Sequence, residues 1–187
     1  TTEKKKGHSN ELRVEKWKWF SLKEISNVYT GDDLILSMVD DGEIPVASHK
    51  VENNGVGAMV DKIDNRQLFD CEKTIALADR GCFHASVQTE DFYIGTRVKA
   101  LEMKCCVSKG VLIFIATIVN QETFKYSYGR KVTEEKYMND IIDLPIQHNV
   151  DGTPFIDEDK KYSDAGYVPD WQFMEDYIKS LPYGDRL

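Results

Sequence analysis

Long apolar runs are missing from this sequence. A membrane-spanning helix needs about 18–20 consecutive apolar residues, whereas the longest apolar stretch, Val111 to Val119, covers nine residues. The N-terminus, Thr1 to Lys6, is polar and basic and no apolar segment follows it, so no secretory signal is predicted. We therefore expect a cytoplasmic protein with no membrane contact. The missing initiator methionine favours a piece of a longer polypeptide or a processed chain.

Cysteine and histidine are scarce, and their spacing argues against a metal centre. Zinc ligands usually stand about two to four residues apart. Here Cys105 and Cys106 are adjacent, Cys71 and Cys82 stand alone, and the histidines are scattered. We expect reduced cysteines packed as small apolar groups, and a chain that needs no metal and no cofactor.

Motifs of common enzymes are also missing. No glycine-rich cofactor loop follows a predicted strand, and neither a Gly-x-Ser-x-Gly elbow nor an Asn-Pro-Pro-Tyr-type methylation motif occurs. Asp170 with Asp176 and Lys179 comes nearest to a nuclease motif, but we interpret it as a helix cap with surface charge. The sequence therefore predicts a non-catalytic protein. A small enzyme built on the middle strands remains the alternative, without a convergent acid, base and nucleophile to support it.

The composition is that of an ordinary globular domain, but the charge is uneven. The 187 residues are 41% hydrophobic and 30% charged, enough for one domain with its own core. The net charge of −8 at first argues against a polyanionic partner. Residues 134–187 supply all of it, whereas residues 1–133 carry 19 basic and 19 acidic side chains. Residues 94–131 hold seven basic and two acidic side chains, so one block is positive.

Hydrophobic periodicity predicts an α+β fold with a central β meander or small twisted sheet, a buried helix and a C-terminal helix. Residues 1–10 are expected to form a disordered arm, and the domain should cover 11–187. Proline cannot donate to a central ladder, so Pro45 should place its strand at a sheet edge or sit at a first strand position. The expected strands are 27–31, 44–48, 74–78, 82–89 and 92–103.

Helices are predicted from spacing and capping residues. Ser21 with Glu24 favours a short capped turn, and Asp170 after Pro169 should begin a helix that ends at Leu181. The β-branched run from Val111 to about Phe124 fits a buried helix or a buried strand. Helical spacing is also found over 34–39 and 137–142, and 147–168 should form a polar loop with a short hairpin.

The strongest candidate site is a basic and aromatic cluster. Cations hold phosphates, arginine can contact guanine through two hydrogen bonds, and tyrosines can stack or donate to phosphate. The same run also fits a helix C-terminus with basic residues and a glycine cap. The cluster consists of Lys125, Tyr126, Tyr128, Gly129, Arg130 and Lys131.

Two further segments carry polar side chains suited to nucleic acid. Lys50, Asn53 and Asn54 follow the Ile-Pro strand, and asparagine can read adenine edges, although an ordinary solvated turn fits equally well. Arg80 and His84 flank a glycine turn, where His84 also fits a half-buried histidine.

In their order along the chain, these segments resemble the target-recognition domain of restriction-modification DNA specificity (S) subunits, of type I or of the related type IIG/IIB-like systems. The resemblance covers about residues 11–187. It is carried by Trp17 to Gly31, Ile44-Pro45 with the Asn-Gly loop, Gly81 to Tyr93, Tyr128-Gly129-Arg130 and Leu144-Pro145. Family subunits usually have two such domains and long helices, so this chain looks like a single-domain fragment, a half-subunit or the C-terminal domain of a fused enzyme.

The resemblance implies sequence-specific binding of double-stranded DNA in phage defence. The implied partners are a DNA methyltransferase subunit or domain, a restriction subunit and a second recognition domain. The methyltransferase would flip the methylated base, so this chain needs no chemistry of its own. The implied phosphate contacts are Lys50, Lys125, Arg130, Lys131 and Lys99, and the implied base-reading residues are Asn53, Asn54, Arg80 and Tyr128.

The last predicted helix carries an apolar stripe, formed by Trp171, Met174, Tyr177, Ile178 and Leu181. We expect it to pack on its own domain. The stripe would alternatively begin a spacer helix or face a methyltransferase. In a protein-interaction module with no DNA-reading role, this aromatic helix would be the docking surface.

Overall fold

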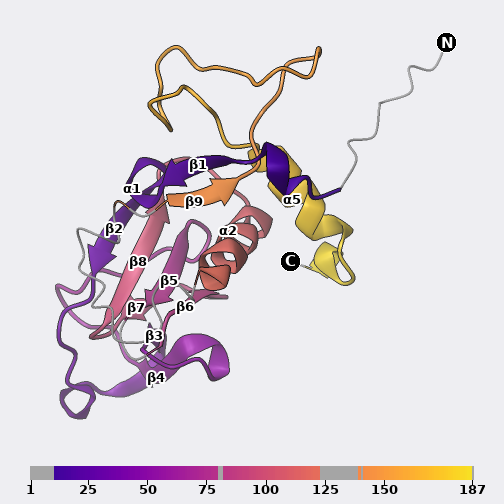
Figure 1. The fold of residues 1–187 in the computed structure, drawn as a ribbon. Helices are drawn as coiled ribbons and strands as arrows, with labels where there is room; N and C mark the ends of the chain where they lie inside the picture. Colours follow the sequence, from indigo (N-terminus) through magenta and orange to yellow (C-terminus); the bar gives the residue numbers. More distant parts are fainter. Residues whose placement is uncertain (1–10, 80–81, 123–138, 140, 187) are drawn as a thin grey trace.

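The computed structural model describes residues 11–79, 82–122, 139 and 141–186, so the expected arm over residues 1–10 lies outside the described residues. Within this part of the chain, small β-sheets pack with two longer helices (Figure 1). The predicted α+β fold with a small sheet, a buried helix and a C-terminal helix is therefore confirmed. No helix among these residues is long and apolar enough to cross a membrane.

The largest sheet carries the main core. Its strands lie in the order β2 (Ser26–Thr30), β8 (Val98–Met103), β5 (Thr74–Ala78) and β6 (His84–Val87), each antiparallel to its neighbour. Successive side chains of a strand point to opposite faces. Ile75 and Leu77 therefore join one apolar cluster while Ala76 joins a second, and β5 is buried along its whole length.

The buried helix is α2 (Lys109–Gln121), which begins where the Ser108 hydroxyl accepts the N–H of Val111 at 3.4 Å. Leu112 and Ile115 lie on its inner face and are fully buried. The helical interpretation of this run is confirmed up to Gln121, and Phe124 lies outside the described residues. The C-terminal helix α5 (Trp171–Ser180) packs against α2, and the Asp170 carboxylate accepts the N–H of Phe173 at 3.0 Å.

A second sheet has the order β4 (Val56–Val60), β3 (Asp41–Ala47) and β7 (Tyr93–Ile94). The prediction that Pro45 lies in an edge strand or at a first strand position is wrong, because β3 is the central strand of this sheet and Pro45 is its fifth residue. Pro45 lies opposite Met59 of β4, and pairing with β7 begins only at Val46. The N–H that proline lacks is therefore not needed at that position. Since β7 pairs with β3, the predicted meander is interrupted between β6 and β8.

The two remaining strands, β1 (Lys18–Ser21) and β9 (Ile141–Leu144), pair with each other in antiparallel register. The helix predicted over 137–142 is wrong for its described part, since Ile142 and Leu144 are buried while Asp143 is exposed, the two-residue period of a strand. Tyr137 and Met138 lie outside the described residues. The turn predicted at Ser21 is confirmed as α1 (Leu22–Ile25) with a capping box to Glu24.

Short 3-10 turns complete the fold: η1 (Val14–Lys16), η2 (Leu36–Met38), η3 (Asn53–Gly55) and η4 (Gly184–Arg186). The helix predicted over 34–39 is reduced to η2, which buries no residue. A helix this short has no packed face to offset the cost of its first turn. The predicted loop with a hairpin over 147–168 is confirmed by isolated bridges, and it projects at the end of the molecule opposite β3 and β4 (Figure 1).

Candidate nucleic-acid interface

The loop between β3 and β4, here called the 48–55 loop (Ser48–Gly55), has an unusual backbone. Asn53, Asn54 and Gly55 all adopt left-handed conformations, with φ angles of 51°, 53° and 79°. Glycine adopts this region freely and asparagine tolerates it better than most residues, which explains the Asn-Asn-Gly sequence. The loop closes on itself, because the N–H of Ser48 donates to the carbonyl of Gly55 at 2.8 Å.

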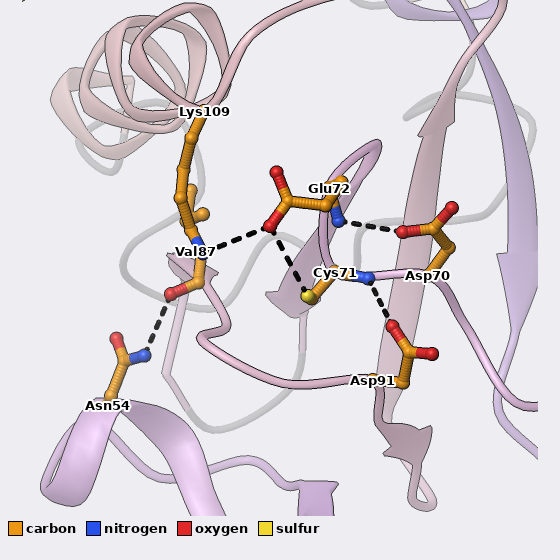
Figure 2. A network of polar contacts seen from close by, with 7 residues as sticks. All are labelled: Asn54, Asp70, Cys71, Glu72, Val87, Asp91 and Lys109. Carbon is orange, nitrogen blue, oxygen red and sulfur yellow. Dashed lines mark hydrogen bonds and ion pairs between the residues drawn. The ribbon is translucent and has the colours of Figure 1, made fainter. Parts of the chain in front are cut away.

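The 48–55 loop lies along β6, the edge strand of the largest sheet. The side-chain amide of Asn54 donates to the carbonyl of Val87 at 2.9 Å (Figure 2). Beyond the other end of β6, the Cys82 thiol donates to the carbonyl of His49 at 3.1 Å. Burial, followed by the charge of Glu52, raises the pKa of Cys82. The loop therefore covers an edge strand that would otherwise expose unpaired backbone groups.

The C-terminal end of α2 reaches the same strand. The side chain of Asn120 accepts the N–H of Ala85 at 2.7 Å and donates to the Ala85 carbonyl at 2.9 Å. Glu122, two residues farther on, is the last residue described before the gap. The 48–55 loop, the start of β6 and the end of α2 therefore meet at one corner of the molecule, which we call the interface corner.

The interface corner brings together four of the predicted contact residues. Lys50, Asn53 and Asn54 are exposed on the 48–55 loop, and His84 is half-buried at the start of the neighbouring β6. The half-buried state of His84 agrees with the second of the two interpretations of that residue. The other predicted contacts lie outside the described residues and stay predictions: Arg80, Lys125, Tyr126, Tyr128, Arg130 and Lys131.

Lys99 is not available for a phosphate, so that prediction is wrong. Its side chain is 5% exposed and lies 3.4 Å from the Asp79 carboxylate, whose side chain is 7% exposed. The Lys99 ammonium also donates to the Thr30 hydroxyl at 3.1 Å. This buried ion pair joins β8 to Asp79, the residue that follows β5.

Sequence reasoning missed the polar residues that hold the interface corner together. Gln88 is 2% exposed, and its side-chain amide donates to the Asn54 carbonyl at 3.0 Å and to the Ser86 hydroxyl at 2.9 Å. Asn120 and Asp79 were missed in the same way. Their hydrogen-bond or ion-pair partners lie far away in the sequence, so no local sequence motif indicates their role. For Asn120 alone, a polar residue directly after an apolar run was an available signal.

A separate group of potential metal ligands lies near the other end of β5. Ligand atoms of Asp70, Cys71 and Asp91 come within 4.8 Å of one another. Asp91 accepts the N–H of Cys71 at 3.0 Å, and Asp70 accepts the N–H of Glu72 at 2.9 Å (Figure 2). Burial raises the pKa of Cys71 and so favours its neutral thiol. Both aspartates therefore have backbone partners that explain their positions.

The four cysteines are free. Cys71 is buried, while Cys82 and Cys105 are half-buried and Cys106 is exposed. Packing as a small apolar group thus describes Cys71 but not Cys106.

The apolar stripe of α5 packs on its own domain, as predicted. Met174 and Ile178 are buried, and the Tyr177 ring meets the edge of Phe114 at 5.8 Å. Leu181 remains 41% exposed. The interpretation of Asp170, Asp176 and Lys179 as a helix cap with surface charge is also confirmed. Asp170 caps α5. On the surface of the helix, Asp176 accepts from Gln172 and Lys179 pairs with Glu175.

Comparison with known proteins supports the resemblance seen in the sequence. No family model matches the chain. The specificity subunit S.BcgI of a type II restriction enzyme from Heyndrickxia coagulans is 27% identical over 177 residues, which cover 91% of this chain and 45% of that protein. The chain therefore spans less than half the length of this relative.

Two crystal structures of specificity subunits share the fold. The HsdS subunit of Thermoanaerobacter tengcongensis superposes with a TM-score of 0.54 at 15% identity, over 72% of this chain and 34% of that one. The type I restriction-modification S subunit of M. genitalium superposes with a TM-score of 0.54 at 13% identity. The match covers 87% of this chain and 37% of that one. The resemblance of this chain to a target-recognition domain of restriction-modification specificity subunits, predicted from its sequence, is thereby confirmed.

Proposed function

We propose that this chain binds double-stranded DNA sequence-specifically and gives target specificity to a restriction-modification methyltransferase and endonuclease. The similarity to a specificity subunit over 91% of the chain carries the proposal. The chain itself would be non-catalytic and would act in the cytoplasm, in defence against phage. Its partners would be DNA, a modification subunit or domain, a restriction subunit and a second recognition domain.

The interface corner is the face that we assign to DNA. Lys50 and Asn53 are exposed on the 48–55 loop. This loop is bonded at His49 to Cys82 before β6 and at Asn54 to Val87 at the end of β6, and Arg80 precedes His84 in the chain. Described residues of the opposite, projecting segment 147–168 include five acidic and two basic side chains, which disfavour contact with phosphates. Lys50 would hold a phosphate, whereas Asn53 would read a base edge.

The basic and aromatic cluster supplies the remaining contacts in this proposal. Its chain segment leaves the described part of the protein at Glu122, two residues beyond Asn120 at the interface corner. Lys125, Arg130 and Lys131 would hold phosphates while Tyr126 and Tyr128 stack or donate.

A docking role for α5 has less support. The residues of its stripe that a partner would need are already used by the core, since Met174 and Ile178 are buried and Tyr177 lies against Phe114.

Selection from a random-sequence duplex library tests the proposal. The bound fraction is sequenced, and affinity is measured by fluorescence anisotropy at low and moderate salt. We expect a short enriched motif, and weaker binding by the Arg130→Ala/Lys131→Ala variant. The matched control is Lys160→Ala/Lys161→Ala, a second adjacent basic pair, which lies exposed on the projecting segment.

Absence of binding by the isolated chain leads to a second arm, in which the modification subunit of the same system is added. Sequence-dependent binding that needs this partner still supports the proposal. No sequence preference with or without the partner would overturn it.

A further inference from the structure

The 48–55 loop adopts a backbone conformation that asparagine and glycine tolerate but that a run of three residues seldom takes. Three consecutive left-handed residues, Asn53, Asn54 and Gly55, are uncommon, because this region suits only glycine well. Such a backbone persists when the surrounding structure holds it in place. The contacts that hold this loop therefore determine where its exposed side chains point.

Those contacts converge on Asn54 from β6 and the residue after it. Asn54 donates its side-chain amide to the Val87 carbonyl at 2.9 Å and accepts, through its backbone carbonyl, the Gln88 amide at 3.0 Å (Figure 2 shows the first contact). Gln88 also donates to the Ser86 hydroxyl at 2.9 Å. A side-chain amide has two N–H donors, so both donors of the buried Gln88 have partners.

The loop also lies too close to β6 to shift freely. A methyl group at Gly55 would meet the Ser86 hydroxyl at 3.3 Å, a tight contact even for a small side chain. Ser86 is itself buried and bonded to Gln88. Loop and strand therefore fit closely at the end of β6, where Asn54, Ser86, Val87 and Gln88 meet.

The two adjacent asparagines have different surroundings. They share nearly the same φ, 51° and 53°, and both are exposed. Asn54 is tied to Val87 and Gln88, whereas among the described residues no contact ties the side chain of Asn53 or Lys50. This difference separates residues that hold the loop from residues that are free to meet a ligand.

We propose that Asn54, Gln88 and Ser86 form a clamp that positions the 48–55 loop for reading DNA, so that Asn54 sets specificity without touching a base. The inference rests on the proposed function and deepens it. Asn54 is a positioning residue here, and Asn53 and Lys50 are the contact residues whose geometry depends on it.

Matched glycine variants test the clamp in the full chain. Glycine accepts a left-handed φ, so Asn54→Gly and Asn53→Gly both keep the backbone and remove one side-chain amide. In Asn54→Gly we expect hydrogen exchange at the amides of Ser48 and Gly55 to accelerate roughly fivefold, the effect of losing one net hydrogen bond. Asn53→Gly should leave these exchange rates unchanged. Gln88→Met should repeat the result of Asn54→Gly from the strand side.

Selection from the random duplex library then tests the link to DNA. Asn54→Gly should weaken the preference at the base position that Asn53 reads, although Asn53 itself is unchanged, with an unchanged dependence of affinity on salt concentration. Asn53→Gly should weaken the preference at one position. A purely structural role would leave the sequence preference of Asn54→Gly intact, and this result would overturn the inference.

The two readouts separate failure of the clamp from failure of the proposed function. If amide hydrogen exchange at Ser48 and Gly55 is unchanged in both Asn54→Gly and Gln88→Met, the clamp does not exist. This conclusion holds for any result of the DNA-binding selection. A wild-type chain that selects no sequence, even with its modification subunit, overturns the proposed function and the DNA-reading part of the inference, while the exchange rates still decide whether the clamp exists.

Discussion

The interface corner and the projecting segment 147–168 are both polar, but they are held together differently. In the interface corner, Asn54 bonds to Val87 33 residues away, and Asn120 bonds to Ala85 35 residues away. In the projecting segment, Asp151 accepts from Thr153 and Asp157 accepts from the N–H groups of residues two and four positions ahead. One region depends on the tertiary fold, and the other largely holds itself in shape.

This difference bears on function. Local turns form and break with little consequence for distant residues, whereas side chains held across the fold keep fixed positions only while the whole domain is folded. A surface that must present side chains to a ligand in one geometry benefits from the second kind of support. The interface corner has it, and the acidic segment at the other end of the molecule has much less.

The largest expected effect comes from breaking the buried ion pair. Lys99→Met leaves the Asp79 carboxylate buried without its partner, and we expect the free energy of unfolding to fall by about 3–5 kcal/mol. Lys179→Met, which removes an exposed pair with Glu175 on α5, should change the free energy of unfolding far less, because exposed ion pairs contribute little. Urea unfolding followed by circular dichroism measures both.

A second replacement sharpens this test. Lys99→Met/Asp79→Leu removes both charges, and most of the lost stability should return because no charge stays buried alone. Equal losses in Lys99→Met and Lys179→Met would instead show that the buried ion pair of the largest sheet contributes no more to stability than an exposed pair on α5.

The cysteines offer a footprint of the DNA-binding face. Cys82 contacts the 48–55 loop, whereas Cys106 is exposed beyond the opposite end of β8. Duplex DNA that carries the selected motif should slow the reaction of Cys82 with a maleimide and leave Cys106 unchanged. Because its raised pKa keeps Cys82 largely as a thiol, the reaction should be followed at mildly alkaline pH by mass spectrometry. Equal protection of both cysteines would argue against the interface corner.

Charge on the two regions should matter unequally for DNA. Lys50→Ala should weaken binding to all sequences and lower the slope of log affinity against log salt by about 1, the loss of one phosphate contact. Lys160→Ala, on the projecting segment, should leave the slope unchanged. Anisotropy titrations over a salt series measure both slopes. If the slope changed equally in Lys50→Ala and Lys160→Ala, DNA would show no preference for the interface corner over the projecting segment.

The same contrast explains what could be predicted from the sequence. The turn at Ser21, the strand over 74–78 and the cap at Asp170 were predictable because their signals lie within a few residues. Strand β9 was mistaken for helix because its partner β1 is more than a hundred residues away, and only that pairing decides its conformation.

The site was predictable in the same limited way. Lys50 and the two asparagines stand out as polar loop residues, and their order along the chain fits the family resemblance. The burial of Lys99 and the role of Gln88 could not be predicted, because each depends on which distant residue the fold places beside it. A lysine in an alternating strand looks the same in the sequence whether it faces solvent or a buried aspartate.

The smallest expected effect compares two carboxylates whose pKa values are both lowered. Glu102 has its pKa lowered first by the hydrogen bond from Lys73, while that of Asp151 is lowered by Thr153, two residues away. A carboxylate with a lowered pKa adds stability above its unfolded pKa, and this contribution disappears as the pH falls through its folded pKa.

Glu102→Gln should therefore lower the free energy of unfolding by about 0.5 kcal/mol at neutral pH, because Lys73 is partly exposed and the pair is screened. The variant and the wild type should converge as the pH falls through the lowered, folded-state pKa of Glu102. Asp151→Asn should leave the pH dependence of unfolding nearly unchanged, since its bond to Thr153 is local and can persist when the rest of the domain unfolds. Urea unfolding at a series of pH values compares them. Equal pH dependence in both variants would mean that the projecting segment is coupled to the fold as tightly as the sheet.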